Sequence, residues 1–248
     1  MALCGFGLTI FRLDVELAMQ MGTPTLFCGN EVPVQPILCD PDVSSGPFSK
    51  AASWMPLIML NLLSFSRLLN EVETRQKLKL NPLDYTETLL FLLYRLVEIS
   101  RLGQPSTKRG GLYGNVTNLT MLAFMTTLLP EYTRDGSSGT LLSDRLGSAI
   151  QDLCVIESES LGCNPPLLLW VLLMSGISVL NPQHYHWLLP LIADTCERLK
   201  LNNWAVIQQQ LGQFPWIFAL HEAPGHRLWE ETRLRSRTIS WETSARDS

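Results

Sequence analysis

The sequence predicts an all-α, multi-helix protein, and three observations lead to that fold class. Apolar residues recur at steps of three and four along most of the 248-residue chain, which is the period of a helix buried on one side. Clusters of Pro, Gly and Asn separate these stretches, as expected where helices end. No convincing train of alternating β-branched residues, the pattern of half-buried strands, occurs along the chain. A core built from packed helices is therefore expected.

The first expected helix covers residues 8–21, with Leu13 and Leu17 on its apolar side, and stops at Gly22-Thr23-Pro24. The region of about 30–50 follows and carries four prolines. Proline fixes φ and removes a backbone donor, so this region should be an irregular, extended connection.

Two longer helices are expected next. The first covers 53–80, because leucines lie along one side of it, and Asn81-Pro82 breaks it. Asp84 is followed three residues later by Glu87, the arrangement of a capping box, and should begin a helix over 85–102.

The remaining expected helices show the same periodicity. They cover 116–129, 141–159, 165–180, 184–201, 204–211 and 226–235. Asn203 should cap the short helix over 204–211. Gly225 is expected to precede the last helix, so His221 and Glu222 should lie in a loop before Pro224.

Composition and charge set limits on function. Charged residues make up 17% of the chain, below the roughly 25% typical of globular domains, so large surfaces should be buried or covered by partners. A net charge of -4 argues against a general nucleic-acid binder. Four arginines, Arg227, Arg233, Arg235 and Arg237, make the C-terminal end locally basic. They are expected to lie in a solvated region, and we divide the chain into a domain over 1–235 and a polar tail over 236–248.

A block rich in Leu and Trp runs from Pro165 to Trp229, and its composition allows three interpretations: a membrane span, an aromatic ligand site or a helical core. The apolar run between Pro165 and Pro182 is shorter than the roughly 20 residues that a span needs. No Lys or Arg closely flanks the run to fix an orientation. A buried core helix is therefore expected, and no membrane partner.

The tryptophans leave one question open. Six of the seven lie on separate expected helices or at their ends, at positions 54, 170, 187, 204, 216 and 229. Large rings contribute much buried area, so convergence on one core is the default expectation. Lining a small-molecule cavity between helices is the alternative, and the sequence does not separate the two.

The sequence contains none of the common catalytic or metal-binding motifs. His184 and His186 stand two apart, which places them on different faces of a helix, and all four histidines are expected at the surface or at helix ends. The six cysteines form no C-x-x-C pair and should be reduced, partly buried thiols. We expect no enzyme, no cofactor, no metal and no catalytic residue, and no residues can be assigned to a ligand pocket.

An all-α isoprenoid enzyme is the least favoured class. Such an enzyme would need clustered carboxylates for magnesium. The nearest candidate, Asp40-Pro41-Asp42, is broken by proline and lies in the expected irregular connection.

The order of motifs in the C-terminal half resembles a known family. Pro165 to Ile177 is followed by Trp187, Trp204, Phe214-Pro215-Trp216 and Leu228 to Glu231. This order is similar to the C-terminal half of the fungal-specific transcription factor domain, the helical regulatory region of fungal binuclear zinc-cluster transcription factors.

The N-terminal part adds to the resemblance and also departs from it. Arg12 to Met19, followed by Gly22-Thr23-Pro24, looks like the helix that in this family ends in Gly-Arg-Pro, with Thr23 in place of the Arg. The cysteines of this chain cannot supply the C-x2-C-x6-C pattern of the zinc cluster.

The resemblance implies a nuclear regulatory domain that controls transcription without contacting nucleic acid itself. Its implied partners are the transcription machinery or co-regulator proteins, together with a small-molecule effector. The alternative is a stand-alone helical scaffold or sequestering protein descended from such a factor.

Overall fold

The computed structural model describes residues 2–27, 57–74, 80–100, 102, 112–129, 140–157 and 164–246. Every regular element in these ranges is a helix, which confirms the all-α fold class. None of the helices in these ranges is both long and apolar enough to cross a membrane. The irregular connection expected at about 30–50, and with it Asp40-Pro41-Asp42, lies outside the described residues.

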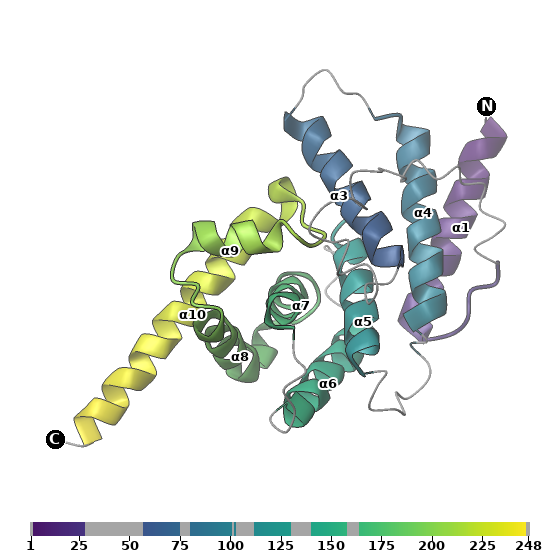
Figure 1. The fold of residues 1–248 in the computed structure, drawn as a ribbon. Coiled ribbons are helices and arrows are strands. Elements are labelled where there is room, and N and C mark those ends of the chain that lie inside the picture. The colour runs from purple at the N-terminus through teal and green to yellow at the C-terminus, as the bar shows by residue number, and fades with distance from the viewer. Residues whose placement is uncertain are drawn as a thin grey trace.

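Within the described residues, the N-terminal half contributes the helices that occupy the centre and right of Figure 1. They are α1 (Ala2–Met21), α3 (Leu57–Thr74), α4 (Pro82–Ser100), α5 (Leu112–Thr126) and α6 (Thr140–Glu157). Helix α4 packs against α1, α3 and α5, and α5 in turn packs against α6. Helix α5 also contacts α7, and so joins this half to the rest of the molecule.

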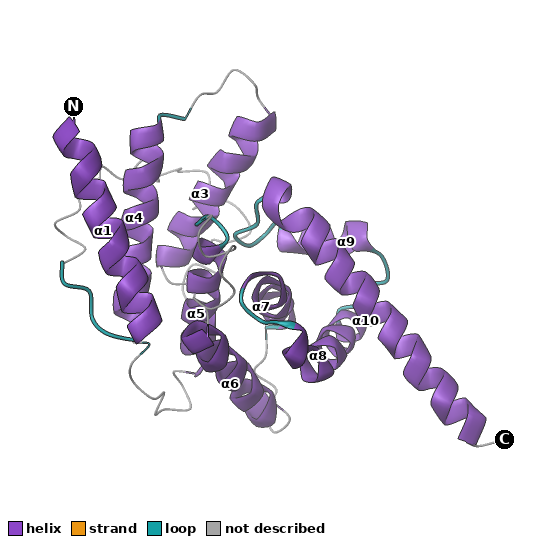
Figure 2. Cartoon of the chain, turned by 180° about the vertical axis from the view of Figure 1, so that it is seen from behind, coloured by secondary structure: helices purple, strands orange, loops and turns teal. Residues whose placement is uncertain are grey.

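The C-terminal half is arranged around one central helix, seen almost end-on in Figures 1 and 2. Its elements are α7 (Pro165–Ser178), the 3-10 helix η4 (Pro182–His184), α8 (Tyr185–Arg198), α9 (Trp204–Leu211) and α10 (Phe218–Arg246). Helix α7 contacts α5, α8, α9 and α10. Helix α10 packs along α8, and its C-terminal part runs out beyond the other helices (Figure 2).

The sequence of α7 explains its central place. The side chains from Leu167 to Gly176 are all buried, because the helix is apolar on every side. Asn164 caps the helix by accepting a hydrogen bond from the Leu167 N–H, and the two prolines that follow occupy first-turn positions where no backbone donor is needed. The core interpretation of the Leu- and Trp-rich block is thereby confirmed for α7.

Helix α1 corrects the first apolar pattern. It begins at Ala2, and its buried side consists of Val15, Ala18 and Met19. Leu13 and Leu17, expected on the apolar side, are 60% and 49% exposed. The prediction was wrong because α1 carries apolar residues on two faces. The face with Val15, Ala18 and Met19 is the one buried where α1 packs against α4 and α6.

A buried carboxylate fixes the turn after α1. Asp14 is 6% exposed, and its Oδ1 accepts a hydrogen bond from the Leu26 N–H at 2.8 Å. Its Oδ2 accepts from the Phe27 N–H at 3.1 Å and from the Tyr94 hydroxyl of α4 at 2.7 Å. This one side chain therefore joins α1, the following turn and α4.

The start of α4 differs from the capping box predicted at Asp84. The helix begins at Pro82, and Asn81 Oδ1 accepts a hydrogen bond from the Leu83 N–H at 3.1 Å. Asp84 lies in the first turn instead. Asn81 is a favoured N-cap residue, and the fixed φ of Pro82 suits the first helical position. The helix therefore begins three residues before the start that the Asp-x-x-Glu pattern predicted.

The last helix is also longer than predicted. Helix α10 begins at Phe218 rather than near residue 226, so His221 and Glu222 are helical and Pro224 lies inside the helix. The shorter α9 agrees with its prediction, since Asn203 Oδ1 accepts a hydrogen bond from the Val206 N–H at 3.0 Å. Helix α10 also runs across residue 235, and the boundary between the domain and the polar tail stays a prediction.

Candidate functional site

The Phe214-Pro215-Trp216 corner before α10 is held by the central helix. The Trp170 indole of α7 is fully buried, and its Nε1–H donates a hydrogen bond to the Pro215 carbonyl at 2.9 Å. The same ring stacks on Phe214 with 5.8 Å between the ring centroids. The polar edge of Trp170 is thus satisfied while its body fills the core.

Helix α3 fixes the other side of this corner. The Asn70 Nδ2 donates to the Trp216 carbonyl at 2.8 Å, and the Phe218 N–H donates to Asn70 Oδ1 at 2.9 Å. These contacts join residues almost 150 positions apart and satisfy one of the free donors at the start of α10. The α10 helix therefore starts at a place that only the folded chain defines.

His221 is buried in the first turn of this helix, which corrects its predicted place in a loop. It is 1% exposed, and its ring meets the Phe124 and Trp216 rings edge-on. Burial lowers the pKa of the imidazole from 6.5 to about 3, so the ring is neutral at physiological pH.

Its hydrogen bonds define the tautomer of this neutral ring. The Ile217 N–H donates to His221 Nδ1 at 3.0 Å, so the proton must reside on Nε2. Nε2 lies 2.9 Å from the Thr127 hydroxyl, which in turn donates to the Phe124 carbonyl at 2.6 Å. His221 consequently donates to Thr127, and the chain of bonds joins α10 to the end of α5. We assign this residue a structural role.

A second aromatic cluster lies further along α10. Trp204 of α9 packs against His226 and Trp229 of α10, with 5.3 and 6.0 Å between ring centroids, and His226 stacks on Trp229 at 5.7 Å. The Trp204 Nε1–H donates to Glu222 Oε1 at 2.5 Å. The Arg233 guanidinium lies over the outer side of this cluster, 4.9 Å from the centre of the Trp229 ring.

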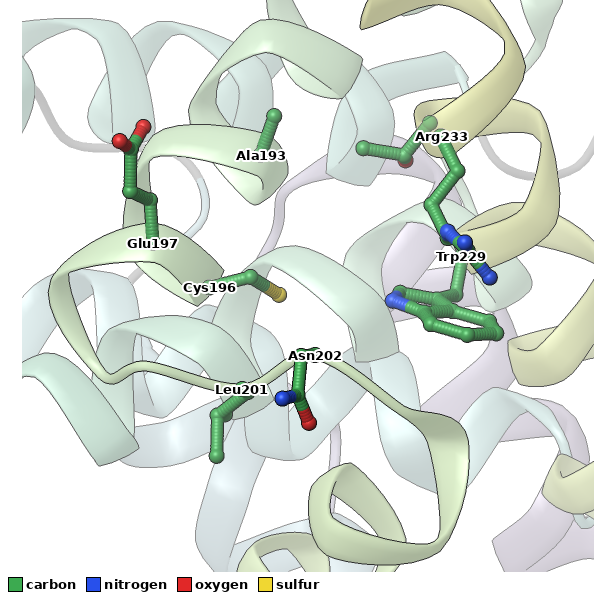
Figure 3. Close-up of a pocket in the computed structure, with 8 residues that line it drawn as sticks. Ala193, Cys196, Glu197, Leu201, Asn202, Trp229 and Arg233 are labelled. Atoms are coloured by element: carbon green, nitrogen blue, oxygen red, sulfur yellow. The ribbon is translucent and has the colours of Figure 1, made fainter.

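A groove of about 410 Å³ opens beside this cluster, between α8, the following turn and α10 (Figure 3). Its lining residues are Ala193, Cys196, Glu197, Leu201, Asn202, Trp229, Thr232 and Arg233. We call this feature the α8–α10 groove. Its volume is within the range of about 300–1,000 Å³ typical of small-molecule sites.

The end of α8 forms one wall of the α8–α10 groove. Lys200 adopts a left-handed conformation with φ 55°, and the Leu201 N–H donates to the Cys196 carbonyl at 2.8 Å. The Lys200 N–H donates to the Glu197 carbonyl at 2.9 Å, which completes a Schellman-type helix end. After this sharp reversal, Leu201 and Asn202 line the groove (Figure 3).

Two of the polar side chains that line the groove are neutral or already hydrogen-bonded. Burial raises the pKa of the Cys196 thiol to about 11, so the sulfur is neutral and a poor nucleophile. The Thr232 hydroxyl already donates to the Leu228 carbonyl at 2.9 Å. No three His, Cys, Asp or Glu side chains gather as metal ligands in the part of the chain that the structure describes. Exposed polar groups remain at Glu197, Asn202 and Arg233.

The core interpretation of the tryptophans is confirmed for Trp170, Trp216 and Trp229, which are all buried in the core. Trp229, which is 6% exposed, also lines the groove, and the role of a ligand contact stays a prediction for it. Trp187 and Trp204 are half-buried and pack against the core, and Trp54 lies outside the described residues. Of the other histidines, His184 and His226 are half-buried and His186 is exposed.

The groove residues other than Trp229 were not singled out as ligand contacts from the sequence. Arg233 follows Trp229 by four positions on one helix, a spacing at which side chains meet, and that pairing was the available signal. Glu197 and Asn202 carry no such signal, because only the end of α8 brings them to α10.

Comparison with known proteins gives no match: no protein-family model, no curated protein and no solved structure is significantly similar to the chain. The all-α fold class therefore rests on the structure itself. The family suggested by the order of motifs stays an expectation, and function has to be inferred from the residues and the groove.

Proposed function

We propose that the chain is a regulatory domain of a fungal zinc-cluster type of transcription factor. It acts in the nucleus through co-regulator proteins and responds to a small-molecule effector in the α8–α10 groove. The proposal rests on one observation. The residues that carry the family resemblance, on α7, the Phe-Pro-Trp corner and α10, pack together and support that groove.

The groove gives the proposed effector a way to act. Its walls belong to α8 and α10, which pack against each other and against α7. A ligand that fits one spacing of these helices better than another shifts the population toward that packing. A ligand with equal affinity for both packings would change nothing, so the two helices must differ in position between the active and inactive states.

A tethering assay tests the transcriptional role. The full chain is fused to an unrelated DNA-binding domain and directed to a reporter gene in a fungal cell. We expect reporter output to change relative to the DNA-binding domain alone, because the domain would recruit or block the transcription machinery.

Gly176→Leu provides a control for that assay. A Cβ at Gly176 would lie 2.6 Å from Leu228 Cδ2 and 3.0 Å from Leu188 Cδ2, so a large side chain there should disrupt the packing of α7, α8 and α10. The reporter effect should disappear in this variant. An unchanged reporter with the folded parent fusion present in the nucleus would refute the proposed function.

A further inference from the structure

We propose that the α8–α10 groove binds a small organic monocarboxylate with an apolar body. The carboxylate pairs with Arg233, and the body lies against Trp229 and the apolar lining. This inference rests on the proposed function, since it names the class of effector that the same groove would take.

Arg233 supplies the group that recognises the acid. Its side chain is exposed and lines the groove, and within the described part of the chain no carboxylate lies within ion-pair distance of its guanidinium. A guanidinium presents its N–H donors in a planar fork that matches the two oxygens of a carboxylate. The donors of Arg233 are therefore available to an incoming anion.

Stacking on Trp229 holds this guanidinium in place. The Arg233 Cζ lies 4.9 Å from the centre of the indole, and Trp229 is itself packed against Trp204 and His226. A long side chain normally loses much rotational freedom when it binds a ligand. Because the indole already restrains Arg233, less of that freedom remains to be lost.

The lining below Arg233 is suited to an apolar body. Ala193, Leu201 and Trp229 contribute apolar surface, and the Cys196 sulfur between them is a neutral thiol (Figure 3). Asn202, which is exposed and also lines the groove, adds an amide that can donate or accept a hydrogen bond. A short aliphatic or aromatic acid satisfies both the charged and the apolar part of this lining.

Glu197 restricts the proposed ligand to one that carries a single negative charge. Glu197 lines the same groove from α8, and its carboxylate lies on the side away from Arg233 (Figure 3). One anionic group can pair with Arg233, but a second would be repelled by Glu197. Dicarboxylates and phosphate should accordingly bind more weakly than a monocarboxylate of the same body.

Calorimetric titration of the full chain tests the inference. The probes are 3-phenylpropanoate, its neutral amide 3-phenylpropanamide, phenylsuccinate and inorganic phosphate. We expect the monocarboxylate to bind at least tenfold more tightly than the amide and than phosphate. Arg233→Gln should remove the preference for the acid over the amide.

Arg227→Gln is the matched control, because Arg227 is exposed on the same helix and does not line the groove. It should retain the parent's preference. Equal binding of acid and amide to the parent, no binding of either, or the same loss in both arginine variants would overturn the inference.

Glu197→Gln tests the selectivity separately and should bring the affinity for phenylsuccinate closer to that for 3-phenylpropanoate. An unchanged ratio between the affinities for the two ligands would contradict the role given to Glu197. These titrations use the isolated chain and the reporter assay uses no added ligand, so either proposal can fail alone.

Discussion

At the scale of single residues, two buried polar side chains account for the position of α10. Trp170 satisfies the Pro215 carbonyl before the helix, and His221 accepts the Ile217 N–H at its start. Both hydrogen bonds are shielded from water, so losing either would leave a buried polar group without its partner.

Removing the Trp170 ring should strongly destabilise the fold. Trp170→Ala removes a fully buried indole together with its hydrogen bond, and we expect the free energy of unfolding to fall by about 3–5 kcal/mol. Denaturant unfolding followed by circular dichroism measures this. Trp170→Phe, which keeps most of the ring volume, should lose less. Unchanged stability in the alanine variant would contradict the central role of this residue.

His221 makes stability depend on pH in a defined direction. Folding lowers the pKa of its imidazole from 6.5 to about 3, so between these values the unfolded chain binds a proton that the folded chain excludes. The contribution is complete above pH 6.5 and is lost as the pH falls toward 3, with a slope of up to about 1.4 kcal/mol per pH unit.

Two measurements check this prediction. The free energy of unfolding should fall between pH 6.5 and 5, and the slope should be smaller in His221→Gln. In NMR spectra of the folded parent, the His221 ring should remain neutral down to about pH 4. A His221 ring that titrates near 6.5 would disprove its assignment as a buried, neutral group.

At the scale of elements, close contacts at particular residues set how the helices meet. Asp14 joins α1 to α4, and Gly225 allows α9 and the Phe-Pro-Trp corner to approach α10. These two positions connect opposite ends of the molecule to their neighbours, so each can be tested without disturbing the other.

Asp14→Ala should loosen the packing of α1. The change leaves the Leu26 and Phe27 N–H groups and the Tyr94 hydroxyl without their shared acceptor, and we expect a loss of about 3 kcal/mol or more in unfolding free energy. Glu16→Gln on the same helix is the control. Its partly exposed pair with Arg12 should contribute no more than about 1 kcal/mol. Equal losses in the two variants would argue against the role of Asp14.

Gly225→Ala should separate the aromatic rings around α10. A Cβ there would lie 3.0 Å from both Trp204 Cη2 and Trp216 Cη2, and rigid indoles cannot move aside by a small rotation. We expect destabilisation of about 1–3 kcal/mol. Gly114→Ala in α5 is the matched control, because its Cβ meets nothing within 4 Å and alanine favours the helix by about 1 kcal/mol. A lower melting temperature in Gly114→Ala but not in Gly225→Ala would contradict the close packing assigned to Gly225.

At the scale of the whole molecule, sequence reasoning predicted what depends on local signals. The fold class, the start of α7 at its two prolines and the cap at Asn203 all come from residues close in the chain. The start of α10 was missed because Asn70 and Trp170, far away in the sequence, determine it. The groove could not be assigned either, since packing of α10 against α8 brings its two sides together.

The proposed domain boundary at residue 235 can be tested by truncation. Thr232 is buried, whereas residues 233–235, the last of the predicted domain, are exposed. Removing 236–248 should leave the melting temperature within a few degrees of the full chain, as expected for changes outside the core. A large loss of thermal stability would move the boundary beyond residue 235.

The projecting end of α10 turns a small movement into a large one. The helix has 29 residues, and at 1.5 Å per residue the 14 residues after Thr232 extend about 21 Å. A tilt of about 10° at the groove would therefore sweep the far end of the helix by roughly 4 Å, following simple lever geometry. A pair of spin labels, one near Arg246 and one on α5, would register such a tilt as a change in distance.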